Sequence, residues 1–114
     1  MTKYPKDGRV YIDHILDEID AMTEFVSDGS RDKKTYYAVI RCFEVIGEAT
    51  NKMPKDFKEA HPDFPWQKMI GMRNILIHDY LGIDDNDLWN TIKYDVPSLK
   101  KQLSELKEKL KDKE

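Results

Sequence analysis

Apolar side chains recur every three or four positions through most of this chain, and short polar breaks separate the stretches with that period. Such a stripe predicts an amphipathic helix from about residue 9 to residue 26. The apolar positions of this helix are Ile12, Ile15, Leu16, Ile19, Met22 and Phe25. The break at residues 27–30 contains Gly29, which suits the left-handed conformation in which many helices end.

A second helix is predicted from about residue 33 to residue 52, with Ser30 or Asp32 as its N-terminal cap. Its apolar positions are Tyr36, Val39, Ile40, Phe43, Ile46 and Ala49 or Thr50. Gly47 lies inside this helix, where glycine costs roughly 1 kcal/mol relative to alanine. A close crossing with another helix would explain why a glycine stands there.

The middle of the chain predicts a short helix and then a longer one. Pro54 suits the first turn of a helix that ends near residue 60. The proline-flanked connection at residues 61–65 should be extended, because residues before proline avoid the helical region. The longer helix starts at Trp66. We expect it to turn four apolar side chains inward, Met69, Ile70, Leu76 and Ile77.

A long last helix is predicted from about residue 87 to residue 111, capped by an acidic residue within 84–87. Its apolar positions approach a heptad pattern: Leu88, Ile92, Leu99, Leu103, Leu106 and Leu110. Pro97 removes one backbone donor, so we expect a kink near Tyr94. Because no repeat, low-complexity tract or linker divides the chain, residues 1–114 are expected to form one all-α domain.

Charge and composition narrow the classes of function. The chain has 19 Lys and Arg against 22 Asp and Glu, a net charge of −3, which argues mildly against holding nucleic acid by bulk electrostatics. Any chemistry on a nucleic acid would therefore need a local basic patch or a groove in a dimer. No stretch has the pattern of a signal peptide or membrane span, so a cytoplasmic protein without membrane contact is expected. The single cysteine, Cys42, is interpreted as a small buried hydrophobe.

The segment from Arg73 to Tyr80 concentrates the candidate chemistry. Metal-free RNA cleavage needs a base for the 2′-hydroxyl, an acid for the leaving 5′-oxygen and a cation for the phosphorus-centred transition state. His78 suits either proton transfer, and Arg73 suits the phosphate. However, five positions of a helix rotate by about 140°, and one histidine leaves one proton transfer unfilled. Either the helix ends near Ile77 or two chains share the site, and we expect the shared site.

Structural interpretations of the same residues stay open. An arginine and a histidine near a helix end often only cap carbonyls and favour the negative end of the helix dipole. Glu48 is expected either to be solvated, to pair with a neighbouring cation, or to orient Arg73 from a facing helix. Two other histidines are weaker candidates, since His14 lies on the polar side of a helix and His61 in a proline-flanked loop.

A metal site is the chemical alternative. Four carboxylates follow His78, and carboxylate oxygens suit Mg²⁺ or Mn²⁺. These residues are Asp79, Asp84, Asp85 and Asp87. Their spacing matches no metal-binding loop, and acidic residues are ordinary at a helix start. We therefore expect no bound metal and rank capping above metal binding.

The arrangement Arg73-Asn74, three residues, His78, one residue, Tyr80 resembles the R-N-x-x-x-H-x-Y signature of HEPN-domain proteins, specifically the HepT-like ribonuclease toxins. Three further segments resemble that family in the right order. Residues 38–49 are similar to its second helix, residues 65–72 to its approach to the motif and residues 87–99 to its final helix. The likeness thus covers most of the chain.

The resemblance implies an all-α HEPN-type antiparallel bundle of four to five helices that forms a homodimer. It also implies a metal-independent endoribonuclease, without a cofactor, that is the toxin of a type VII-like toxin–antitoxin pair. Arg73 and His78 would be the catalytic pair, with Asn74 and Asp79 as supporting polar groups. Tyr80 would be the hydroxyl that a cognate MntA-like nucleotidyltransferase antitoxin modifies with AMP.

The off-switch has a simple physical basis, because AMP adds bulk and negative charge where an RNA phosphate should bind. Two interpretations without catalysis remain. One is a helical module that dimerises and binds a nucleotidyltransferase partner, and the other is a purely structural dimer.

Overall fold

The computed structural model describes residues 8–80 and 85–111, without the side chains of residues 74–80 and 85–87. These residues are almost entirely helical, and no strand occurs among them, which confirms the all-α fold class. The elements in chain order are α1 (Gly8–Phe25), α2 (Lys33–Lys52), α3 (Lys55–Ala60), α4 (Trp66–Tyr80), α5 (Asp85–Asn90), the π-helical segment η1 (Thr91–Asp95) and α6 (Val96–Lys111).

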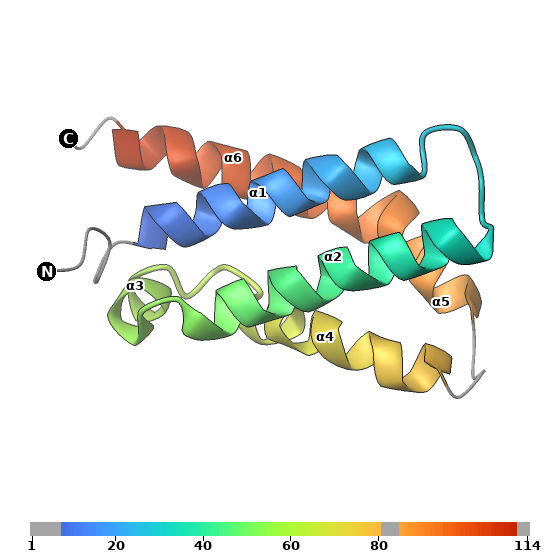
Figure 1. The fold of residues 1–114 in the computed structure, drawn as a ribbon. Coiled ribbons are helices and arrows are strands. Elements are labelled where there is room, and N and C mark those ends of the chain that lie inside the picture. Colours follow the sequence, from blue (N-terminus) through green and yellow to red (C-terminus); the bar gives the residue numbers. More distant parts are fainter. Residues whose placement is uncertain (1–7, 81–84, 112–114) are drawn as a thin grey trace, which may run out of the picture.

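Four long helices make the bundle, and they lie side by side in the order α6, α1, α2, α4 (Figure 1). The start of α1, the short helix α3 and the end of α6 lie at one end of the bundle. The α1–α2 connection and α5 lie at the other end. Helix α4 runs from the α3 end toward the α5 end, so its last turns lie far from α3. The helical layout places the segment that follows Arg73 at the α5 end of the bundle.

The apolar stripes predicted from sequence form one core between the helices. The fully enclosed side chains include Ile12, Ile15, Ile19, Met22, Val39, Phe43, Ile46, Met69, Leu88, Leu103 and, near its edge, Leu99 and Leu106. Phe25 departs most, since 45% of its surface is exposed at the last position of α1, and several other stripe positions are only partly buried, among them Leu16, Tyr36, Ile40 and Ile70. Met72, which the stripe did not include, is buried. The prediction for Ile77 and Leu76 lies outside the described side chains.

The predicted helix ends agree with the structure at α2. Asp32 is its N-terminal cap and accepts a hydrogen bond from the Thr35 backbone N–H at 2.8 Å. That bond stabilises the carboxylate, so the pKa of Asp32 lies below its usual value. Gly29 has a φ of 78°, which confirms the left-handed conformation expected after α1.

The connection between α3 and α4 is a turn, so the expected extended geometry is wrong. The Phe64 backbone N–H donates to the His61 carbonyl at 3.2 Å. The indole N–H of Trp66 donates to the carbonyls of Lys58 and His61, at 3.0 and 2.9 Å. Because one buried indole binds both carbonyls, the chain must fold back between them. This turn fixes where α4 begins.

The last helical stretch is continuous in backbone but changes type. Helix α5 is followed by the π-helical turn η1, and the Val96 backbone N–H donates to the Thr91 carbonyl five positions earlier. Pro97 has no N–H to give, and π-helical turns accommodate such breaks in the ordinary ladder. The kink near Tyr94 stays a prediction, and the acidic cap expected at residues 84–87 lies outside the described side chains. No helix in the described ranges is long and apolar enough to cross a membrane.

Candidate functional site

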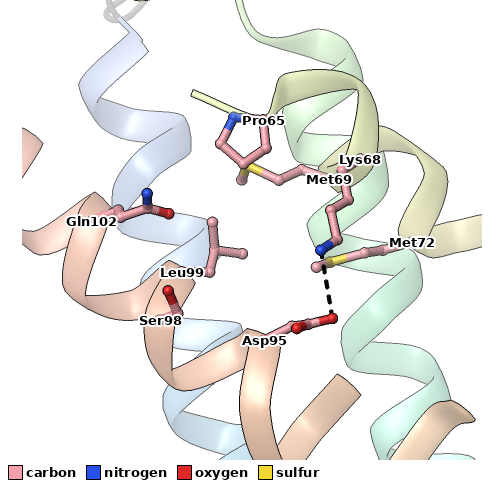
Figure 2. A pocket seen from close by; sticks show the side chains of 8 residues that line it. All are labelled: Pro65, Lys68, Met69, Met72, Asp95, Ser98, Leu99 and Gln102. Atoms are coloured by element: carbon pink, nitrogen blue, oxygen red, sulfur yellow. Dashed lines mark ion pairs between the residues drawn. The ribbon is translucent and has the colours of Figure 1, made fainter. Parts of the chain in front are cut away.

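A cavity between α4 and α6 is too small to receive a nucleotide. Its volume is about 90 Å³, and Met69, Met72 and Leu99 form part of its wall (Figure 2). Lys68 and Asp95 form an ion pair at 3.5 Å beside it. Sites for small molecules have volumes of roughly 300–1,000 Å³. This cavity is therefore a small cleft at the surface between helices rather than a substrate site.

The crossing of α2 and α4 occurs at Gly47. A Cβ atom at this position would lie 3.0 Å from the Arg73 Cβ and 3.0 Å from the Ile70 carbonyl oxygen. Such distances are tighter than most Cβ contacts in proteins, so a side chain at this position would require α4 to shift by a few tenths of an ångström, and glycine avoids that shift. The close crossing expected from the sequence is confirmed. On α4, the residue that meets Gly47 at this crossing is Arg73, the first residue of the candidate motif.

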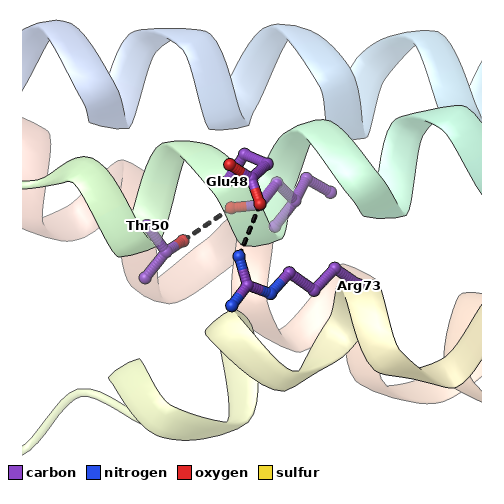
Figure 3. Close-up of polar contacts among 4 residues, drawn as sticks. Glu48, Thr50 and Arg73 are labelled. Carbon is purple, nitrogen blue, oxygen red and sulfur yellow. Dashed lines mark hydrogen bonds and ion pairs between the residues drawn. The ribbon is translucent and has the colours of Figure 1, made fainter.

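Beside this crossing, Arg73 is bound to Glu48. The Arg73 Nη1 donates to the Glu48 Oε1 at 2.5 Å, and the two side chains are 38% and 49% exposed (Figure 3). In the same part of α2, the Thr50 hydroxyl donates to the Ile46 carbonyl at 2.8 Å. Glu48 thus pairs with Arg73 from the facing helix, which is the geometry that an orienting role requires. That role itself stays a prediction.

The other motif residues lie further along the same helix. Because α4 continues to Tyr80, the helix does not end near Ile77, and that route to bringing Arg73 and His78 together is excluded. The backbone position of His78 is turned by about 140° around the helix axis from that of Arg73, and the position of Tyr80 by about 20°. The side chains of Asn74, His78, Asp79 and Tyr80 lie outside the described part of the chain. Their contacts remain predictions.

The structure does not test the candidate metal site, but it does describe the surroundings of the cysteine. The acidic residues considered for Mg²⁺ lie where the structure does not describe side chains, and no group of three possible ligands occurs among the side chains that it does describe. Cys42 is buried, and burial raises the pKa of its thiol to about 12, with the negative charge of Glu18 adding to the effect. The interpretation of Cys42 as a small buried hydrophobe is confirmed.

A groove between α1 and α2 contains residues that the sequence reasoning did not single out or ranked low. It has a volume of about 420 Å³ and includes His14 from α1, with Arg41, Glu48 and Lys52 from α2. Glu48 belongs both to this groove and to the pair with Arg73. The sequence could have indicated that these α2 residues lie together. Positions 41, 48 and 52 are separated by seven and four residues and so share one face of a helix.

Comparison with known proteins gives a consistent result. The family model described as ribonuclease HepT-like matches residues 12–106. The chain is 45% identical to "Probable ribonuclease HepT" of Thermococcus cleftensis, over 85% of this chain and 93% of the relative. It is 39% identical to "Putative RNase MJ0125" of Methanocaldococcus jannaschii, over 95% and 97%. It is also 39% identical to "Putative RNase TTE0752" of Caldanaerobacter subterraneus, over 93% and 99%. No solved structure matches the chain.

Proposed function

The chain belongs to the HepT-like ribonuclease family, and we propose that it is a metal-independent endoribonuclease that serves as the toxin of a toxin–antitoxin pair. The observation that carries the proposal is the contact between Glu48 and Arg73, on the helix that continues through His78 and Tyr80. An arginine held in place beside an accessible surface suits the binding of a phosphodiester. In this proposal residues 1–114 act as one cytoplasmic domain.

The proposed reaction uses the 2′-hydroxyl of RNA as the nucleophile. The imidazole of one His78 removes the proton from the 2′-hydroxyl, and the 2′-oxygen then attacks the phosphorus. The bond to the 5′-oxygen breaks, a second imidazole protonates that oxygen, and a 2′,3′-cyclic phosphate remains. Arg73 stabilises the negative charge on the non-bridging oxygens in the transition state. Asn74 and Asp79 support the pair by hydrogen bonding.

A homodimer supplies the second imidazole. The helical rotation of about 140° between positions 73 and 78 disfavours both groups of one chain reaching the same phosphate. A twofold axis near the ends of two α4 helices would bring Arg73 of one protomer near His78 of its partner. The same axis would double the local positive charge, which answers the difficulty of a net charge of −3.

The proposed off-switch is Tyr80. A nucleotidyltransferase antitoxin directs the phenol oxygen to the α-phosphorus of ATP, which transfers AMP and releases pyrophosphate. Tyr80 stands seven positions after Arg73 and therefore close to the same side of α4. A phosphate on Tyr80 would place bulk and negative charge on the side of α4 that carries the guanidinium, about two turns away, so substrate would be excluded.

The direct test is RNA cleavage by the purified protein in the presence of EDTA. We expect cleaved RNA with 2′,3′-cyclic phosphate ends from the wild type and no cleavage from His78→Ala. Expression of the wild type alone should arrest bacterial growth, and His78→Ala should relieve the arrest. Intact RNA after incubation with wild-type protein that carries an unmodified Tyr80 would overturn the nuclease proposal.

A non-catalytic dimer that binds a nucleotidyltransferase is the second candidate. One observation favours it, because a net charge of −3 gives RNA little bulk electrostatic attraction to the protein. In that case Arg73 and Tyr80 would bind a nucleotide without cleaving a bond. Stable complex formation with the nucleotidyltransferase, together with intact RNA, would support this candidate over the first.

A further inference from the structure

The groove between α1 and α2 is large enough for part of an RNA strand. We call it the α1–α2 groove and define it by Tyr11, His14, Arg41, Glu48 and Lys52, with two apolar residues of α2 at its floor. Its volume of about 420 Å³ falls in the range of roughly 300–1,000 Å³ typical of small-molecule sites. From Arg41 to Lys52 it follows eleven positions of α2, about 16 Å of helix axis, which exceeds the length of one nucleotide.

The cations of the α1–α2 groove are available to an anion. The Arg41 side chain is 72% exposed and meets Glu44 at 3.5 Å, and exposed pairs of this kind hold their partners weakly. Lys52 lies in the last turn of α2, and no acidic side chain in the described part of the chain forms an ion pair with it. The charged side chains that line the groove are two cations, Arg41 and Lys52, and one carboxylate, Glu48. The lining therefore has one more positive than negative charge, in a protein that is acidic as a whole.

The α1–α2 groove adjoins the candidate site through Glu48. This carboxylate lines the groove and, at the same time, binds the Arg73 guanidinium at the α2–α4 crossing. A strand whose scissile phosphate lies at Arg73 would therefore pass the groove with its neighbouring nucleotides. On the other wall, Tyr11 and His14 offer aromatic rings three positions apart on α1. Basic side chains next to aromatic rings are the usual way in which proteins hold single-stranded nucleic acid.

We propose that the α1–α2 groove is a subsite for the RNA strand beside the scissile phosphate. Arg41 and Lys52 bind backbone phosphates, and Tyr11 and His14 contact a base. The inference rests on the proposed ribonuclease function, because it assumes an RNA substrate at Arg73. It concerns binding and position, since none of these four groups touches the reacting atoms.

The test measures binding apart from cleavage. A fluorescent single-stranded RNA is titrated with the His78→Ala protein, and anisotropy is read at several salt concentrations. The groove variant carries Arg41→Gln and Lys52→Gln in that background. The matched control carries Lys101→Gln and Lys109→Gln, which remove the same charge from exposed positions on α6. Light scattering reports the oligomeric state of each protein.

We expect the groove variant to bind RNA about tenfold more weakly, with a salt slope shallower by about 1.4 because two phosphate contacts are lost. The control should stay within about twofold of its parent. In otherwise wild-type protein, the groove substitutions should raise KM and leave kcat nearly unchanged.

Three results would overturn the inference: equal binding by groove variant and control, no RNA binding by the parent, or a change in oligomeric state confined to the groove variant. The last result would identify the groove as a contact between subunits. Failure of the ribonuclease proposal itself would be seen in the cleavage assay, as intact RNA after incubation with the wild-type protein. The two failures are therefore distinguishable.

Discussion

The guanidinium of Arg73 on α4 donates a hydrogen bond to the carboxylate of Glu48 on α2, across the point where Gly47 lets the two helices meet. Arginine has many rotamers, and a fixed acceptor from a second helix restricts them before any substrate arrives. Both side chains remain partly exposed, so an RNA phosphate can still reach the other nitrogens of the guanidinium.

Replacing Glu48 by glutamine should lower kcat without unfolding the protein. Glu48→Gln keeps the size of the side chain but removes the charge that holds Arg73, and we expect a loss of roughly fivefold, ~1 kcal/mol. The free energy of unfolding should change by less than about 1 kcal/mol, because the pair is partly exposed. Glu105→Gln is the matched control, since Glu105 is an exposed glutamate on α6, outside both the Arg73 contact and the α1–α2 groove. Equal effects of the two changes on kcat would contradict an orienting role for Glu48.

Gly47→Ala should destabilise the protein by up to about 2 kcal/mol. The gain in helix propensity is about 1 kcal/mol, but the new Cβ would press on the α4 backbone, and overpacking costs about 1–3 kcal/mol. Urea denaturation measures the difference. Gly71→Ala is the control, because no described atom lies within 4 Å of its Cβ, and it should raise stability by up to about 1 kcal/mol. If both changes stabilise the protein, the helix crossing is not the reason for Gly47.

Arg73→Lys should reduce cleavage by roughly 100-fold while the fold is retained. Lysine keeps the positive charge but loses the planar pair of donors that matches a phosphate in the transition state. Steady-state cleavage of a defined RNA gives the rate, and circular dichroism checks the fold. Cleavage near the wild-type rate would limit Arg73 to a structural role.

Tyr80→Phe should keep nuclease activity and escape neutralisation. The change removes only the hydroxyl that receives AMP, so growth arrest should persist when the nucleotidyltransferase is co-expressed. Mass spectrometry of the intact protein should find AMP on the wild type and none on the variant. Tyr94→Phe is the control, because Tyr94 is 61% exposed and should not matter for the switch. Continued silencing of Tyr80→Phe by the partner would exclude Tyr80 as the target.

Cys42 should resist alkylation in the folded protein. Its pKa is raised to about 12 by burial, so very little thiolate is present at pH 8, and iodoacetamide should label only the unfolded chain. The folded state holds the proton more tightly than the unfolded state. The free energy of unfolding should therefore fall as the pH rises from about 9 toward 12. Rapid labelling of the native protein at pH 8 would contradict the buried position.

Local periodicity was sufficient for much of the fold. The apolar stripes predicted three of the long helices closely, and the end of the fourth, because a helix that must bury one face repeats its apolar residues near 3.6 positions. Phe25 departs from this rule since a residue at a helix end can lie beyond the edge of the core. The turn at residues 61–65 departs from the expected extended form because the indole of Trp66, the next residue, binds the carbonyls of Lys58 and His61, which no apolar period indicates.

The sequence by itself determined the helices, most of the core and the motif from Arg73 to Tyr80, since these depend on residues within a few turns of one another. The sequence also suggested a close crossing at Gly47 and offered the contact between Glu48 and Arg73 as one alternative. Only the tertiary structure decided that Glu48 meets Arg73, that α4 is the helix that crosses at Gly47, and that Arg41, Lys52 and His14 border one groove. The physical reason is that pairing across helices depends on the angle and closeness of their packing, which no local period specifies.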